Sequence, residues 1–484
     1  MRTALLLMLV VTAPAVLAQN AASDAGRLGT ITFPTSAGAA AAQTDFVTGV
    51  LYMHSFEYDE AAEAFRAAQA KDPGFALAYW GEAMTHTHPL WNQQDLAAGR
   101  AALGKLAATP QTRAAKAPTE RERRWLETAE VLYGEGSKAR RDTLFARAME
   151  RLVADHPDDE ARAFLALAYL GLNQAVRDVP SYMRAGAIAL DILQRNPDHP
   201  GAAHYAIHAF DDPAHAPLGL NAARAYSGIA PGAAHAQHMT THIFLALGMW
   251  PEVIAQNTIA AGPDRRRWTA GHYTYWLHYG LLQAGRTEEA VALLDELRAN
   301  DDGSSSPRIR MHLALARAHQ AITAERWTDG AMNWPLGAAT FPPLFTAIDA
   351  FAQGFVALRR GDTTTAAALY ADLERVSGAA ANSKMPKLLA GQLDAALMRE
   401  RGDKAGAERR LREVAARAAA LPVEFGPPDF VKPPYELLGE WLLADGRAAD
   451  ARQAFEASLA LMPGRLLSTR GLEQANDALA IATK

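Results

Sequence analysis

A regular alternation of small and large side chains, closed by a proline, restricts the fold of this chain more than any other feature. Residues 49–73 read GVLYMHSFEYDEAAEAFRAAQAKDP. The small, large and terminating positions of this window are Gly49, Tyr52, Ala61, Phe65, Ala68 and Pro73. Small side chains let two helices approach closely, large ones fill the gaps between them, and a proline ends the second helix. The window therefore predicts a closely packed pair of helices.

The same spacing returns near the C-terminus and, with varying quality, between the two ends. In residues 438–463 it is carried by Gly439, Gly446, Ala451, Phe455 and Pro463. This pattern resembles the tetratricopeptide repeat (TPR) family over most of residues 45–463. The resemblance implies an all-α, TPR-like superhelical solenoid of about eight to ten helical pairs, with the residues after the last proline as a capping helix.

The N-terminal residues have the composition of a targeting segment. Residues 1–18 combine Arg2, a short apolar core and a cleavage-like Val16-Leu17-Ala18, which together indicate a signal peptide. A flexible N-terminal arm, rich in alanine, glycine and serine, is expected over residues 19–44. We therefore expect an exported protein that is periplasmic or secreted.

A linker is expected to divide the repeats into two arrays. The stretch NDDGSSSP at 300–307 has a linker composition, so we expect an N-terminal TPR-like array over 45–300 and a C-terminal array with the capping helix over 301–484. The segments 327–343 and 424–436 are long for connections in a bare repeat. They are either plain spacers or insertions that line a binding surface.

Composition excludes several classes of function. The formal net charge is −5 and the pI about 6.3, so no basic field draws the chain to nucleic acid or anionic lipid. After the signal peptide, no apolar run approaches the ~20 residues of a membrane-spanning helix. The chain contains no cysteine, which rules out disulfides, thiolate-bound zinc and iron–sulfur clusters.

Histidines recur at an interval of 34 residues, which is the length of one TPR unit. The pairs that share this separation are His54 with His88, His204 with His238, and His208 with His242. Residues 204–242 alone hold six of the 15 histidines. The recurrence predicts that these side chains occupy equivalent positions on successive helices.

Two of the histidine motifs have the form H-x3-H, HYAIH from His204 and HMTTH from His238. Four residues turn a helix by about 400°, so each pair projects side by side, as helical metal-binding pairs do. Neighbouring helices lie roughly 8–10 Å apart, which allows the two pairs to converge. We therefore predict that His204, His208, His238 and His242 are metal ligands, on the concave groove face that the TPR resemblance implies.

The prediction extends to further residues. His54 and His88 either join the other four, giving six ligands that split three and three around a metal pair, or form a separate pair. Metal-bound imidazoles usually donate their second N–H to a carboxylate or carbonyl, so nearby acids are expected. The additional ligands, hydrogen-bond partners or pocket residues that we consider are Glu57, Glu82, His86, Asp211, His235, His272, Tyr275 and Tyr279.

Imidazole-dominated coordination without thiolate suits copper or zinc, with iron as a further option. The first hypothesis is an exported TPR solenoid whose concave groove holds a polyhistidine transition-metal centre. The protein would then either handle metal or be a metal-dependent oxidoreductase or hydrolase that acts on a small molecule or peptide in the groove. The pattern identifies no catalytic residue. The alternative is a metal-free TPR scaffold that binds a peptide or protein partner of the cell envelope, with histidines that titrate near a pKa of about 6.5.

Overall fold

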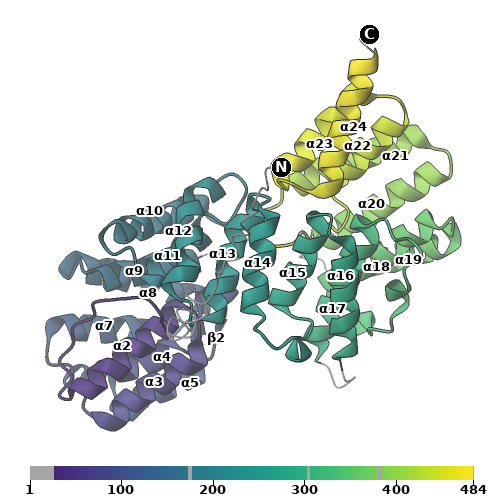
Figure 1. Ribbon diagram of the computed structural model, residues 1–484. Helices are drawn as coiled ribbons and strands as arrows, with labels where there is room; N and C mark the ends of the chain where they lie inside the picture. The colour runs from purple at the N-terminus through teal and green to yellow at the C-terminus, as the bar shows by residue number, and fades with distance from the viewer. Residues whose placement is uncertain (1–26, 173–176, 302–305, 380–383, 424, 483–484) are drawn as a thin grey trace, which may run out of the picture.

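The computed structural model describes residues 27–172, 177–301, 306–379, 384–423 and 425–482, and these residues are almost entirely helical (Figure 1). Their strands form one short hairpin, β1 (Thr87–His88) paired antiparallel with β2 (Gln93–Gln94). The predicted all-α class is therefore confirmed. The predicted signal peptide at 1–18 lies outside the described residues. Within the described ranges no helix is both long and apolar enough to cross a membrane.

Most of the helices form consecutive packed pairs. The pairs are α2 (Ala40–His54) with α3 (Tyr58–Lys71), α4 (Ala76–Met84) with α5 (Leu96–Leu106), α7 (Glu120–Leu132) with α8 (Lys138–Asp155), α9 (Asp159–Gly171) with α10 (Val179–Arg195), α11 (Pro200–Ala209) with α12 (Ala216–Ile229), α13 (Ala234–Ala246) with α14 (Trp250–Ala260), α15 (His272–Gln283) with α16 (Thr287–Ala299), α18 (Pro343–Arg359) with α19 (Thr363–Ala379), α20 (Met385–Glu400) with α21 (Lys404–Ala419), and α22 (Pro434–Ala444) with α23 (Ala448–Leu461).

The remaining elements connect or cap these pairs. They are the helix α6 (Pro110–Ala114), the 3-10 turns η1 (Pro89–Trp91) and η2 (Arg265–Arg267), α17 (Pro307–Thr323) with the 3-10 turns η3 (Gly330–Asn333) and η4 (Ala338–Thr340), and α24 (Leu466–Ala482). The insertion predicted at 327–343 thus stands where a second helix would pair with α17. Helix α24 packs on α22 and α23 and forms the expected cap at the C-terminal end (Figure 1).

The small and large positions of the sequence pattern pack as predicted at both ends of the solenoid. A Cβ atom on Gly49 would lie 2.7 Å from the ring of Phe65, and one on Gly81 would lie 2.4 Å from the same ring. Near the C-terminus the ring of Phe455 is held in the same way between Gly439, at 2.7 Å, and Gly471, at 2.3 Å. Each phenylalanine therefore fills a gap that only glycine on two flanking helices leaves open.

The described part of the expected N-terminal arm, residues 27–39, is docked along the first array. Leu28 and Phe33 are buried in its core. The backbone N–H of Thr30 donates to the carbonyl oxygen of Asp198 at 2.9 Å, and the hydroxyl of Ser36 donates to the carboxylate of Glu122 at 2.6 Å. Helix α2 then begins at residue 40, inside the predicted arm.

The C-terminal repeats return to contact the middle of the chain. The indole N–H of Trp250 donates to the carbonyl oxygen of Gly464 at 2.9 Å, and the backbone N–H of Leu466 donates to the side-chain oxygen of Gln283 at the same distance. The two clusters of the apolar core interleave over α14 and α15, where Val253 and Tyr279 belong to the first cluster and Ile254 and Trp276 to the second. The boundary at residue 300 stays a prediction.

A fully buried ionic cluster lies at this junction. The carboxylate of Glu436 accepts from the guanidinium of Arg465 at 2.7 Å and from the hydroxyl of Ser468 at 2.8 Å, and it lies 3.1 Å from the ammonium of Lys432. Arg465 also donates to the carbonyl oxygen of Val431 at 3.2 Å. These contacts join the start of α24 to α22 and to the segment that precedes it.

Candidate metal centre

Three successive repeat units place six histidines on α11, α13 and α15. His204 and His208 lie on α11 and His272 begins α15, while α13 carries the other three. The side chains form two groups, and the potential ligand atoms within each group all lie within 4.8 Å of one another. The first histidine group is His204, His208 and His235, and the second histidine group is His238, His242 and His272.

Hydrogen bonds fix the protonation of the second histidine group. The side-chain N–H of Asn257 donates to the carbonyl oxygen of Val253 at 3.0 Å, so its Oδ1 is the acceptor for Nδ1 of His238 at 2.7 Å. Nδ1 of His242 lies 2.5 Å from the carboxylate Oδ2 of Asp211 and donates to it. Both rings therefore carry their proton on Nδ1 and present the lone pair of Nε2.

The two Nε2 atoms of His238 and His242 lie only 3.2 Å apart. Two lone pairs at this distance repel each other, so a cation must lie between them, either a proton or a metal ion. Since His272 places a third imidazole nitrogen within 4.8 Å of these two, the arrangement offers three nitrogen ligands to one centre. That donor set matches an imidazole-bound transition metal with an open coordination position.

The first histidine group has a similar arrangement, in which a hydrogen bond fixes the tautomer of His204. Nδ1 of His204 donates to the carbonyl oxygen of His54 at 2.7 Å, which leaves its Nε2 as a lone pair 3.1 Å from Nε2 of His208. Nε2 of His235 is buried and has no protein hydrogen-bond partner. The two groups are neighbours, because the ring centroids of His208 and His242 are 5.8 Å apart. Together they could hold two metal ions side by side.

Burial favours the neutral, ligating form of five of these imidazoles. Desolvation, followed by the proximity of other histidines, holds the pKa of His204, His208 and His235 well below the ordinary value of 6.5. The same two causes act on the pKa of His238, and they lower the pKa of His272 to about 3. Neutral imidazole is the form that binds a metal, so the ligands need little deprotonation at neutral pH.

Aromatic rings surround the two groups. The ring of Phe56 lies 4.2 Å from that of His204 and stacks on that of His235 at 5.7 Å. Phe56 has a φ of 57°, an unfavourable conformation for a bulky residue, so the surrounding packing holds it in place. On the other side, the ring of Trp276 lies 4.5 Å from that of His242. These rings cover part of the two groups, whereas His235 and His272 remain partly exposed.

The structure brings His204, His208, His238 and His242 together but separates His54 and His88 from them. Nδ1 of His54 lies 2.9 Å from the hydroxyl of Tyr205, and its Nε2 lies 2.9 Å from the carboxylate of Glu160. His54 serves the centre through its backbone oxygen, which orients His204. His88 donates from Nε2 to the carbonyl oxygen of Thr85 at 3.1 Å and stacks on Tyr58.

His54, Glu160 and His199 form a third buried group, in which the carboxylate of Glu160 lies between the two imidazoles. Nδ1 of His199 accepts from the backbone N–H of Ala202, so its Nε2 carries the proton and faces Glu160 at 3.2 Å. Burial alone would raise the pKa of Glu160, but the two histidines outweigh burial and lower that pKa to about 2. Glu160 is thus hydrogen-bonded to His54, while its Oε1 and the Nε2 of His199 are buried without a hydrogen bond.

The other candidate residues divide between partners of the centre and residues outside it. Asp211 holds His242, and Glu57 accepts from the backbone N–H of His235 at 3.1 Å. Glu82 instead pairs with Lys105 at 2.5 Å. Residues outside the two groups also include His86, which is half-buried on the hairpin of β1, and Tyr275 and Tyr279, whose rings lie 6.0 and 4.9 Å from His319.

Sequence reasoning underrated His272 and missed Asn257 and Trp276. His272 lies 34 residues after His238, so it continues the interval that joins His204 to His238. In that register Trp276 occupies the place of a third H-x3-H partner. Tyr275 and Tyr279 face His319 instead, whereas the ring of Tyr273 lies 4.8 Å from that of His238. The spacing could thus have identified His272, whereas nothing in the pattern indicates Asn257, which comes from the partner helix α14.

Two histidines buried away from the centre provide a test of acid sensitivity. His278 donates from Nε2 to the side-chain oxygen of Gln320 at 3.1 Å, because the amide N–H of Gln320 donates to Asp329. Burial lowers the pKa of His278 to about 4, and His319, whose pKa also lies well below 6.5, is its titratable neighbour. An unfolded histidine binds a proton near pH 6.5, so protonation favours unfolding below that pH.

We therefore expect the free energy of unfolding to fall by about 3 kcal/mol on account of His278 as the pH drops from about 6.5 to 4. Above pH 6.5 this contribution is fully present. Urea unfolding across this range should show a shallower decline for His278→Gln, which retains an N–H donor but does not titrate. Parallel pH profiles for the two proteins would contradict the assignment of this neutral, buried imidazole.

Comparisons with known proteins give fold-level likenesses alone. No family model and no curated protein sequence matches the chain. The crystal structure of yeast Tom70 is 12% identical over 91% of this chain and 96% of that chain, with a TM-score of 0.41. The human IFIT1 dimer with PPP-AAAA is 12% identical over 90% of this chain and 89% of that chain, with a TM-score of 0.40.

The P58(IPK) TPR domain is 14% identical over 92% of this chain and 99% of that chain, with a TM-score of 0.23. The helix pairs and their glycine–phenylalanine packing carry the fold assignment independently of these values. The chain is a TPR-like helical solenoid.

Proposed function

We propose that this solenoid binds two transition-metal ions side by side, one on each histidine group. The observation that carries the proposal is the pair of Nε2 lone pairs of His238 and His242, 3.2 Å apart, with both Nδ1 protons committed elsewhere. The first histidine group supports a second ion because His204 presents a lone pair in the same way. His235 and His272 replace His54 and His88 as the third ligands.

The donor set favours copper or zinc. Three imidazoles at each position, without thiolate or carboxylate ligands, suit both metals, and copper binds most tightly among the divalent ions of the first transition series. A copper pair would support redox chemistry, and a zinc pair would supply Lewis-acid and hydrolytic chemistry. The contribution of the protein is to hold the ligand tautomers and to leave a coordination position open on each ion.

Metal content tests the proposal directly. We expect the purified chain, loaded with copper or zinc and freed of excess ion, to retain about two ions per chain by elemental analysis, as two three-ligand sites require. Copper would also give a d–d or charge-transfer band, whereas zinc would leave the protein colourless. A chain that retains no ion of either metal would leave a metal-free scaffold as the function of this TPR-like fold.

Removing a hydrogen-bond partner should weaken only the second histidine group. Asp211→Ala takes away the acceptor that fixes His242, and loss of such a partner typically weakens metal binding by about 10–100-fold. Competition titrations with a chromophoric chelator would measure this change. Asp264→Ala removes a carboxylate from a surface pair with Arg266 and should leave both affinities unchanged. Equal affinities in the two variants would contradict the assigned role of Asp211.

The proposed setting is outside the cytoplasm, and it rests on the signal-peptide pattern of residues 1–18. A copper or zinc site without cysteine suits an oxidising compartment, because its ligands do not oxidise as thiolates do. Under this proposal the solenoid acts on a small molecule that reaches the paired ions.

A further inference from the structure

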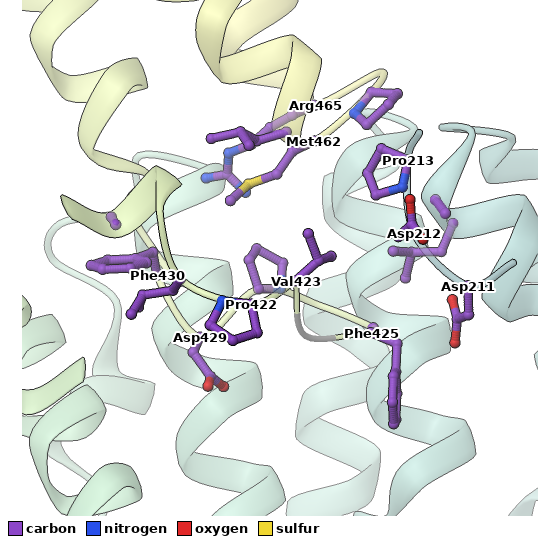
Figure 2. A pocket seen from close by; sticks show the side chains of 18 of the residues that line it. Asp211, Asp212, Pro213, Pro422, Val423, Phe425, Asp429, Phe430, Met462 and Arg465 are labelled. Carbon is purple, nitrogen blue, oxygen red and sulfur yellow. The ribbon is translucent and has the colours of Figure 1, made fainter. Parts of the chain in front are cut away.

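A cavity of about 140 Å³ lies where the C-terminal repeats meet α11, α13 and α14 (Figure 2). Its walls come from the turn after α11, from the ends of α13 and α23, and from the segment between α21 and α22. The apolar residues that the argument uses are Leu245, Trp250, Val423, Phe425, Phe430 and Leu461. Apolar cavities of about this volume accept one molecule of the size of benzene.

The buried charges of the wall are already paired. Asp211 is bound to His242, Asp212 lies 2.9 Å from the guanidinium of Arg177, and Arg465 is bound to Glu436. A charged ligand would therefore find no free counter-charge among these groups, and its own desolvation would oppose binding. Asp429 also lines the wall and is half-buried. With the buried charges paired, the largely apolar wall favours an uncharged occupant.

Exposed apolar side chains gather at the same cavity. Val423, Phe425 and Leu461 are 42, 40 and 36% exposed, and they are three of the few large apolar side chains that the described residues expose to this extent. Clustering of this kind marks a binding surface, whereas single exposed apolar residues need no explanation. A molecule in the cavity would cover all three.

From these observations we propose that the cavity is a binding site for a small, uncharged molecule of about one aromatic ring. The site is separate from the six ligand nitrogens, because it borders Asp211 on the Nδ1 side of His242 and not on the Nε2 side.

Two walls of the cavity also touch the second histidine group. Asp211 holds His242 at 2.5 Å, and the ring of Phe425 lies 5.6 Å from that of His242; Figure 2 shows the two side chains on the same side of the cavity. Occupancy is thereby linked to metal binding, a consequence that rests on the proposed function. Linkage is reciprocal, so each ligand changes the affinity of the other by the same factor.

Fluorobenzene is a suitable probe because its fluorine resonance reports binding to the whole, metal-free chain. We expect saturable binding, weakened at least about tenfold by Val423→Asp, which places a carboxylate in the apolar wall. Val179→Asp is the matched control, since Val179 is also 42% exposed but lies at the start of α10, away from the cavity. Absence of saturable binding, or equal binding by the two variants, would overturn the proposed site.

The linkage has its own measurement. The dissociation constant of fluorobenzene should differ by about fivefold or more between metal-free and metal-loaded protein, and Val423→Asp should abolish the difference. Equal constants in a protein that holds its ions would overturn the linkage. A protein that binds fluorobenzene but no metal would refute the proposed metal function and leave the cavity site supported.

Discussion

The double variant His208→Ala with His242→Ala is expected to lose nearly all bound metal while keeping the helical content of the parent. Each substitution removes one of three ligands from a different histidine group, and two imidazoles hold a transition-metal ion far more weakly than three. The fold should survive because its helix pairs are held by apolar packing that extends far beyond these two rings. Elemental analysis and far-ultraviolet circular dichroism of the same sample would measure both properties.

The matched control is His86→Ala with His88→Ala. These two histidines lie on the hairpin around β1 and share no hydrogen bond with either group, so the control should retain about two ions per chain. The control also tests the sequence prediction that His88 is a metal ligand, because the structure places His88 away from both groups. Metal loss in the control, or full metal content in the His208 and His242 variant, would refute the assignment of the ligands.

Glu436→Gln is expected to lower the free energy of unfolding by about 3–5 kcal/mol, because it leaves the buried guanidinium of Arg465 without its charge partner, whereas Lys432 keeps the carboxylate of Glu440. Arg465 and Lys432 lie within 3.1 Å of this carboxylate, and all three side chains are buried. Glutamine preserves the shape of the side chain, so the change isolates the charge. Urea unfolding at neutral pH would measure the loss.

Low pH should remove the same contribution of Glu436 to the free energy of unfolding from the unsubstituted protein. Burial alone would raise the pKa of Glu436, but Arg465 and Lys432 outweigh burial and lower that pKa to about 2, against 4.5 in its ordinary state. The contribution is therefore complete above pH 4.5 and disappears as the pH falls towards 2. Glu289→Gln, in an exposed pair with Arg286, is the control and should leave the stability unchanged. Equal stabilities of the two variants would contradict the role of the buried cluster.

The sequence was sufficient for the fold because the TPR pattern is local. Gly49, Phe65 and Gly81 recur at intervals that place one large ring between two small residues, and this requirement depends only on neighbouring helices. The return of the C-terminal repeats was not predictable, since the contact of Trp250 with Gly464 joins residues far apart in the chain. The repeat period determines how one helical pair packs on the next, but it does not determine whether distant repeats of the superhelix contact each other.

The candidate centre was predictable in part for the same reason. The interval of 34 residues and the H-x3-H motif identified the rings of α11 and α13, whose positions follow from one helix and its neighbour. His54 shares the interval with His88 but is drawn into a buried network by Glu160, which lies in another unit. A histidine at the 34-residue interval lies at an equivalent position of its helix, but the interval does not determine its hydrogen bonds. Neighbours from other repeat units decide which hydrogen bonds the ring makes.

The segment that crosses the second histidine group belongs to the last repeats of the chain. A Cβ atom on Gly426 would lie 2.5 Å from the indole of Trp276, so this backbone rests directly on the aromatic wall. Because the chain is made from its N-terminus, all six imidazoles are synthesised well before Phe425 and Gly426, which lie against His242 and Trp276. Under the proposed function, an ion bound at the second histidine group before the C-terminal repeats fold would then be slowed in its escape by this segment.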